Sequence, residues 1–216
     1  MAPQASIGVI GGSGFYEFLD GAEEVKIDTP FGPPSDPIAV GEVAGQPVAF
    51  LPRHGRDHRF PPHKIPYRAN MWALRSLGVR RVLAPTAVGS LTLSYGPGTL
   101  VVPDQLVDRT TSREQTFFDR SACHVPFADP YCPSLRPVAI QAARETGWIP
   151  AGSGTLVVIE HDGARLRASP IELGDDAHGL IELAPERRVS QHELHGATPD
   201  HQGERAVLSH MNLLQR

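Results

Sequence analysis

The chain has 216 residues, of which 40% are apolar and 20% are charged, and its formal net charge is −4. This length suits one domain with a substantial core, and the charge content lacks the excess that is typical of disordered segments. The mildly acidic balance argues against general nucleic-acid binding. No apolar run approaches the ~20 residues that a membrane span needs, so no membrane association is expected.

The N-terminal stretch and the cysteines indicate the compartment. The sequence MAPQASIGVIGGSGF has neither the basic region nor the long apolar core of a signal peptide. Cys123 and Cys132 match neither a CxxC redox motif nor a zinc knuckle. We therefore expect a cytoplasmic protein with free thiols.

Short apolar runs that end in glycine or proline predict buried strands in the first 160 residues. In chain order these runs cover residues 6–12, 47–52, 80–91, 98–108 and 154–160, and the fourth is a strand or a strand pair around Pro103. Helical spacing of Tyr67, Met71, Leu74 and Leu77 predicts a helix between Pro66 and Gly78, and residues 135–147 predict a second. Strands that alternate with helices indicate an α/β domain with a largely buried sheet.

The character of the sequence changes after Glu160. Six of the ten histidines lie in residues 161–216, buried-strand runs vanish and helical periodicity becomes faint. We expect an α/β domain over residues 1–160 and a divergent tail over residues 161–216. A shifted reading frame, native divergence and poor order remain open explanations of this tail.

A glycine-rich turn, Gly11-Gly12-Ser13-Gly14, follows the first predicted strand. Its glycines can present backbone N–H groups to an anion, and the Ser13 hydroxyl can add a hydrogen bond. The dinucleotide fingerprint fails because residue 17 is Glu17, and the Walker pattern fails because no Lys-Ser/Thr follows. The alternative interpretation is a turn without a ligand.

A cationic, proline-rich loop follows the strand at 47–52. It begins with Arg53-His54, and a guanidinium binds phosphate through paired charge-assisted hydrogen bonds to which a histidine can add. The alternative is a solvated basic loop. The loop also contains His58 and His63, but no carboxylate cluster accompanies these histidines, so we do not expect a metal site.

Thr86-Ala87-Val88-Gly89-Ser90 forms a third turn of small residues at a strand end, with an ordinary tight turn as its alternative. Three strand ends that each supply donors can meet at one edge of a sheet, which favours a phosphate site there. No G-x-S-x-G elbow selects a serine nucleophile, so a serine hydrolase is not indicated.

Several motifs together resemble methylthioadenosine phosphorylase and its trimeric purine nucleoside phosphorylase relatives over about residues 7–160. They are IGVIGGSGFYEF, FLPRHGRDHRFPPHKIPYRANMWALRSLGV, TAVGSL, VVPDQLVDRTTSREQTFFD, HVPFADPYCPSLR and GTLVVIE. The resemblance implies a single-domain α/β fold with a central mixed, twisted sheet flanked by helices. It implies a homotrimeric pentosyltransferase of purine and methionine salvage, which cleaves the N-glycosidic bond of 5′-methylthioadenosine or another purine nucleoside with inorganic phosphate. No metal or organic cofactor is implied.

The resemblance also implies roles for individual residues. The residues implied to hold phosphate are Ser13, Arg53, His54, Thr86 and Ala87. His124 resembles the family histidine that reaches the 5′ group of a nucleoside in the neighbouring subunit, and its alternative is a structural loop histidine. Asn70 and Trp72 are expected to serve helix capping and packing.

The chain departs from the family after GTLVVIE. The family continues with GPRFSTRAES, a methionine–threonine ribose motif and a purine-site aspartate or asparagine, whereas His161 stands here where the glycine would be. The residue that activates the leaving purine is therefore unknown. A truncated paralogue that keeps only phosphate binding or oligomerisation is the alternative function. The sequence leaves open the preference for 6-amino or 6-oxo purines and for a 5′-methylthio or 5′-hydroxyl group.

Overall fold

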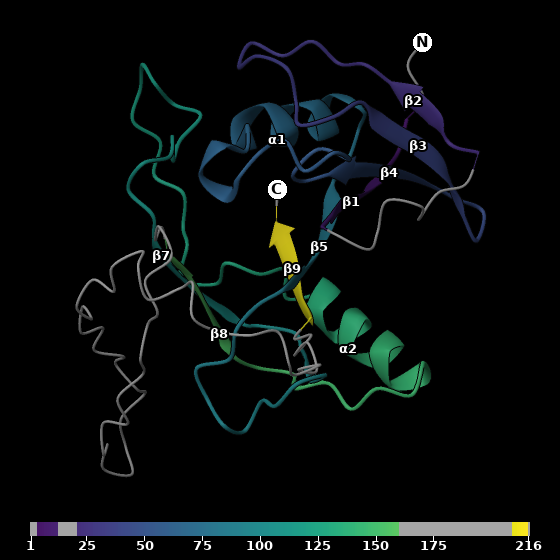
Figure 1. The fold of residues 1–216 in the computed structure, drawn as a ribbon, viewed down its shortest axis with the longest axis vertical. Helices are drawn as coiled ribbons and strands as arrows, with labels where there is room; N and C mark the ends of the chain where they lie inside the picture. The colour runs from purple at the N-terminus through teal and green to yellow at the C-terminus, as the bar shows by residue number, and fades with distance from the viewer. Residues whose placement is uncertain (1–3, 13–20, 160–208, 216) are drawn as a thin grey trace, which may run out of the picture.

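The computed structural model describes residues 4–12, 21–159 and 209–215, the last of these as a backbone strand (Figure 1). Its main feature is a mixed sheet of seven strands in the order β2-β3-β4-β1-β5-β9-β6. Their bounds are β1 Ile7–Gly11, β2 Glu23–Val25, β3 Ile38–Val43, β4 Gln46–Pro52, β5 Arg81–Ala87, β6 Leu100–Val101 and β9 Ser209–Gln215. Strands β7 (Gln105–Arg109) and β8 (Thr155–Ile159) pair in parallel as a separate two-stranded sheet.

Three parallel strands form the centre of the large sheet. Strand β1 lies between β4 and β5, with Ile7 opposite both Val48 and Arg81. Gly11 at the end of β1 is opposite Pro52 at the end of β4. Because parallel strands end at the same edge, the residues that follow β1 and β4 lie next to each other, beside the end of β5.

The two α-helices of the described residues lie where the sequence predicts them, to within two residues at the end of the second. Helix α1 (Tyr67–Ser76) follows Pro66, and helix α2 covers Leu135–Glu145. Gly78 and Gly147 follow them with φ of +90° and +88°, a left-handed conformation that glycine adopts without a steric penalty. A short 3₁₀ helix, η1 (Pro62–Lys64), leads into α1.

The sheet has a hydrophobic cluster on each face. Successive side chains of a strand point to opposite faces, and in β5 Val82 and Ala84 join the cluster that contains Leu74 of α1. Leu83 between them packs against the cluster that contains Ala139 of α2. Figure 1 shows the two helices on either side of β5. The expectation of a mixed sheet flanked by helices is confirmed.

Helix α1 approaches β1 closely at a glycine. A Cβ atom on Gly8 would lie 2.9 Å from Cγ1 of Val79 and 3.6 Å from Cδ2 of Leu74. Since real Cβ atoms do not come closer than about 3 Å, Gly8 lets helix α1 and Val79, in the turn before β5, pack against β1. Leu74, which is almost fully buried, fills this contact.

A small aromatic group lies on the outer side of α1. The Phe31 ring meets Trp72 edge to face with centroids 5.7 Å apart, and meets Phe117 in the same manner at 5.4 Å. The Arg68 guanidinium lies 4.8 Å from the Phe31 centroid. The expected packing role of Trp72 therefore takes the form of an aromatic contact at the surface.

The structure differs from the sequence prediction at three strands. Strands β2 and β3 form an antiparallel edge and were not predicted, because β2 is short and acidic and β3 alternates only over its first half. Strand β9 lies in the segment where no element was predicted, and it pairs with β5 and β6. No helix in the described part of the chain has the length and apolar character needed to cross a bilayer.

Candidate active site

The site lies where β4, β1 and β5 end. Arg53 directly follows β4, and its backbone N–H donates to the carbonyl oxygen of Gly11 at 2.8 Å. Its side chain turns toward β5, where Nη2 donates to Oγ1 of Thr86 at 3.2 Å. Both side chains are half-buried, so the guanidinium remains accessible to a small anion. The structure thus brings two of the expected phosphate residues together.

The sequence predicted Gly12 as part of a turn but missed its steric role in this arrangement. Gly12 lies between Arg53 and Thr86, at the end of β1, and it is buried. A Cβ atom at this position would be 2.9 Å from Nη2 of Arg53. The absence of a side chain lets the Arg53 guanidinium pass over the end of β1, so this glycine provides space as well as a turn.

His54 has a defined hydrogen-bonding pattern. Its Nδ1 lies 2.9 Å from the carbonyl oxygen of Phe60, which can only accept, so Nδ1 carries the proton. Its Nε2 accepts from Nε of Arg53 at 3.3 Å. The ring also stacks on His58 with centroids 6.1 Å apart. Arg53 and His54 are therefore held side by side, with Nε2 of the imidazole as the acceptor.

Of the other three residues expected at the site, two are exposed and one lies outside the described residues. Ala87 ends β5 and is exposed, beside Thr86 and opposite Ser209 of β9. His124 is exposed in the segment between β7 and α2. Ser13 lies outside the described residues.

Two other arginines near the site, Arg56 and Arg68, have carboxylate partners. Arg56 pairs with Glu24 at 2.7 Å, and this hydrogen bond, together with the negative charge of Asp36, raises the pKa of Arg56. Arg68 pairs with Asp119 at 2.9 Å. These cations stabilise the loop and the start of α1, and they are distinct from the Arg53–His54 pair.

Asn70 also differs from its expected capping role. Its buried Oδ1 accepts the backbone N–H of Ser35 at 2.7 Å, so this α1 side chain binds the segment that precedes β3.

Among residues 4–12 and 21–159, no three His, Cys, Asp or Glu side chains are grouped as a metal site would require. The hydroxyl of Ser134, 3.2 Å from Sγ, lowers the pKa of the buried Cys132, while Cys123 is exposed.

A half-buried guanidinium, a histidine and a hydroxyl at the carboxyl edge of parallel strands define an α/β protein with a site suited to a small anion. The chain belongs to the phosphorylase superfamily, whose family model matches residues 6–161.

Two relatives are similar over most of this chain. A purine nucleoside phosphorylase of Streptomyces coelicolor is 61% identical over 166 residues, which are 73% of this chain and 59% of the relative. An S-methyl-5′-thioadenosine phosphorylase of Mycolicibacterium smegmatis is 61% identical over 180 residues, which are 82% of this chain and 67% of the relative. The matched part of the chain thus spans about three fifths to two thirds of the length of these relatives.

Solved structures share the fold. Methylthioadenosine phosphorylase from Schistosoma mansoni in complex with tubercidin matches with a TM-score of 0.71 and 34% identity, over 75% of this chain and 67% of that one. A methylthioadenosine phosphorylase from an antarctic soil metagenomic library matches with a TM-score of 0.68 and 41% identity, over 75% and 58%. The nucleoside-phosphorylase-like fold expected from the sequence is confirmed.

Proposed function

We propose that this chain catalyses phosphorolysis of the N-glycosidic bond of a purine nucleoside by inorganic phosphate. The observation that carries the proposal is the hydrogen bond of 3.2 Å by which Arg53 joins the ends of β4 and β5. It forms an accessible cationic donor set at the sheet edge where α/β proteins bind ligands. Family membership and two relatives that are 61% identical support the same reaction class.

Phosphate is bound by Ser13, Arg53, His54, Thr86 and Ala87. Arg53 supplies parallel N–H donors, and Thr86 supplies a hydroxyl that already accepts from it. His54 adds a ring nitrogen to this set, with Nε2 3.3 Å from Nε of Arg53. Hydrogen bonds hold the side chains of Arg53, His54 and Thr86 in place before the ligand arrives, which lowers the reorganisation that binding requires.

The reaction forms one bond and breaks one. An oxygen of the hydrogen phosphate dianion bonds to C1′ of the ribose as the C1′–N bond breaks. The electron pair of that bond leaves with the purine, which takes up the proton that the phosphate loses. Positive charge develops at C1′ in the transition state, as in other glycosyl transfers. A phosphate dianion held beside C1′ stabilises this charge and is the nucleophile. The products are the free purine and a ribose 1-phosphate.

The proposed nucleoside is 5′-methylthioadenosine, which would give adenine and 5-methylthioribose 1-phosphate. The names of several relatives, and the solved relative bound to tubercidin, support an adenosine-like substrate. His124, exposed on its loop, would contact the 5′ group of a nucleoside held by the neighbouring chain of a homotrimer. Phosphate is a co-substrate, no cofactor is needed, and the cytoplasm is the proposed location.

The direct test is an assay of the purified chain with 5′-methylthioadenosine and inosine, with and without phosphate. We expect release of free purine only when phosphate is present. Phosphate-independent release would point to hydrolysis and contradict the proposal, as would no release from any purine nucleoside.

A second candidate function is phosphate binding without turnover. The observation that favours it is the sequence after Glu160, which lacks the family motifs for ribose and purine. A ligand that binds only the folded chain raises its thermal midpoint, so this candidate predicts stabilisation by phosphate with no purine released. Absence of any phosphate effect would count against both candidates.

A further inference from the structure

The dipeptide Ser35-Asp36 is buried beneath the loop that follows β4, and the proposed reaction does not use it directly. Ser35 has no exposed surface, and Asp36 is 5% exposed. A buried carboxylate is costly unless it is paired and hydrogen-bonded. The position of the Asp36 carboxylate next to a proposed anion site therefore needs an explanation.

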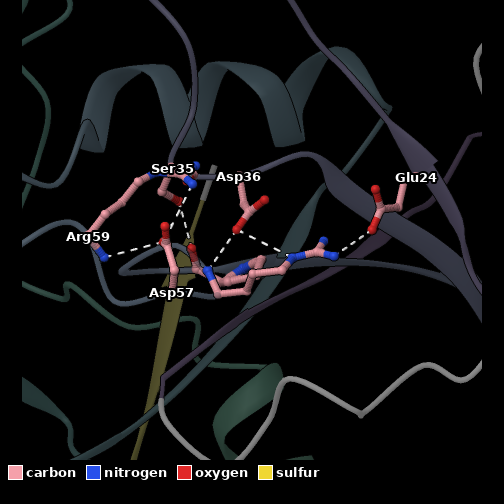
Figure 2. A network of polar contacts seen from close by, with 7 residues as sticks. Glu24, Ser35, Asp36, Asp57 and Arg59 are labelled. Atoms are coloured by element: carbon pink, nitrogen blue, oxygen red, sulfur yellow. Dashed lines mark hydrogen bonds and ion pairs between the residues drawn. The ribbon is translucent and has the colours of Figure 1, made fainter.

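The two residues hold both ends of the tripeptide Arg53–Gly55. The Ser35 hydroxyl donates to the carbonyl oxygen of Pro52, the residue before Arg53, at 2.7 Å. The Asp36 carboxylate accepts the backbone N–H of Arg56, the residue after Gly55, at 2.7 Å. Figure 2 shows Asp36 directed at this loop.

Ser35 is itself fixed from two further sides. Its backbone N–H donates to Oδ1 of Asn70 on α1 at 2.7 Å, and its carbonyl oxygen accepts from Nη2 of Arg59 at 2.5 Å. The contact with Arg59 is visible in Figure 2. The tripeptide is thus connected through Ser35 to a helix in the hydrophobic core, and the connection is made of buried or half-buried groups.

Gly55 packs tightly against this support. It has φ of +74°, and a Cβ atom there would lie 3.2 Å from the carbonyl oxygen of Ser35. Next to it, the Arg56 side chain approaches Asp36 at 3.6 Å and Glu24 at 2.7 Å, so its positive charge compensates the buried carboxylate. Asp36 therefore contributes a backbone contact, whereas Glu24 contacts only the Arg56 side chain.

We propose that Asp36 is a positioning residue: by accepting the Arg56 N–H it sets the backbone of Arg53–Gly55 and holds Arg53 and His54 in their anion-binding arrangement. The functional part of this inference rests on the proposed phosphate site. The conformational part does not, because it concerns only contacts within the chain. The two parts are therefore measured separately.

The test compares the 216-residue chain with its Asp36→Ala, Asp36→Asn and Glu24→Gln variants. The first variant removes the acceptor, the second keeps an acceptor oxygen, and the third removes an exposed partner of the same Arg56 side chain. Hydrogen–deuterium exchange of residues 53–59 reports the loop, and calorimetric titration with inorganic phosphate reports the site. The amide proton resonance of Arg56 gives a spectroscopic signature of the hydrogen bond.

We expect Asp36→Ala to speed exchange in residues 53–59 by about tenfold, the typical effect of losing a hydrogen bond to a charged group, and to weaken phosphate binding by a similar factor. Strands β1 and β5 should exchange as in the unmodified chain. Asp36→Asn should recover most of the affinity, and Glu24→Gln should match the unmodified chain.

Unchanged exchange of residues 53–59 in Asp36→Ala overturns the inference, and so does faster exchange throughout the protein, which indicates a purely structural role. An effect of Glu24→Gln as large as that of Asp36→Ala also overturns it. If Asp36→Ala does not fold, the test is made with Asp36→Asn. In that variant the Arg56 amide proton resonance must move upfield, because its hydrogen-bond acceptor becomes neutral. If the unmodified chain binds no phosphate, the proposed site fails while the exchange data still decide the conformational role.

Discussion

Arg53 and Thr86 are joined by a hydrogen bond of 3.2 Å that crosses the end of a strand belonging to neither of them. Arg53 follows β4 and Thr86 lies in β5, and β1 runs between these two strands. The crossing is possible because β1 is followed by Gly12, whose missing side chain leaves room for the guanidinium. The missing side chain of Gly12 therefore allows residues from three separate sequence motifs to form one site.

Replacing Arg53 with alanine or lysine tests the proposed anion site. Neither variant can offer the paired donors of a guanidinium, so we expect phosphate-dependent turnover to fall by about 10²–10³-fold. Stabilisation by phosphate should be lost with it. The control is Arg75→Lys, which changes an exposed guanidinium on α1 and should leave both measurements unchanged. Equal activity of Arg53→Lys and the unmodified chain would contradict the assignment.

Gly12→Ala tests the steric condition without altering charge. The new methyl group would lie 2.9 Å from Nη2 of Arg53, so the guanidinium must move away from Thr86. We expect phosphate affinity to fall by about tenfold, which corresponds to one charge-assisted hydrogen bond. Gly96→Ala is the matched control, because no heavy atom lies within 4 Å of a Cβ atom at that position. The prediction fails if titration calorimetry gives the two variants the same affinity.

Leu74→Ala tests the packing of α1 against the sheet. Leu74 is almost fully buried and contacts the Gly8 region of β1, so its truncation leaves a cavity. We expect the free energy of unfolding to fall by about 2–5 kcal/mol, measured by urea denaturation. Leu93→Ala is the control, because this leucine is fully exposed and its truncation should change stability by less than about 0.5 kcal/mol. Similar losses in the two variants would refute the core assignment.

The raised pKa of Tyr131 predicts that the free energy of unfolding depends on pH in the alkaline range. Burial, with a further contribution from the negative charge of Asp104, raises the pKa of Tyr131 to about 12, whereas an unfolded chain has a value of about 10. Between these values the unfolded chain loses the phenolic proton first. The contribution of Tyr131 is therefore complete below about pH 10 and is lost as the pH rises toward about 12.

The measurement for Tyr131 is urea denaturation at a series of pH values from about 8 to about 11. The unmodified chain should lose more stability over this range than Tyr131→Phe, which has no proton to lose. Parallel pH profiles for the two proteins would show that Tyr131 does not cause the effect.

The sequence predicted the elements that carry strong local signals. Strands β1, β4 and β5 are apolar runs ended by glycine, by Pro52 or by small residues, and α1 and α2 end just before left-handed glycines. Parallel strands with donors at their ends predicted that Arg53 and Thr86 would meet. Strands β2, β3 and β9 lack such a signal: β2 is short and acidic, β3 alternates only over its first half, and β9 pairs with β5, which lies more than 100 residues earlier.

The support beneath the site could not be predicted from the sequence for a related reason. Ser35 lies 17 residues from Pro52 and 35 residues from Asn70, and no periodic pattern links these positions. Their contacts arise only once β4 and α1 have packed around the segment before β3. The capping role was predicted for Asn70 from its position in its own helix alone. In the structure its side chain instead accepts a hydrogen bond from Ser35, which is distant in the sequence.

The edge-to-face contact of Phe31 and Trp72 gives this molecule an intrinsic fluorescence reporter. Trp72 lies two residues after Asn70 on α1, and Phe31 lies four residues before Ser35, so the indole senses the packing of the segment that supports the anion site. The chain has two tryptophans, and replacing the other, Trp148, leaves Trp72 as the sole tryptophan. Ligand titrations can then be followed by emission alone, without a label and without turnover.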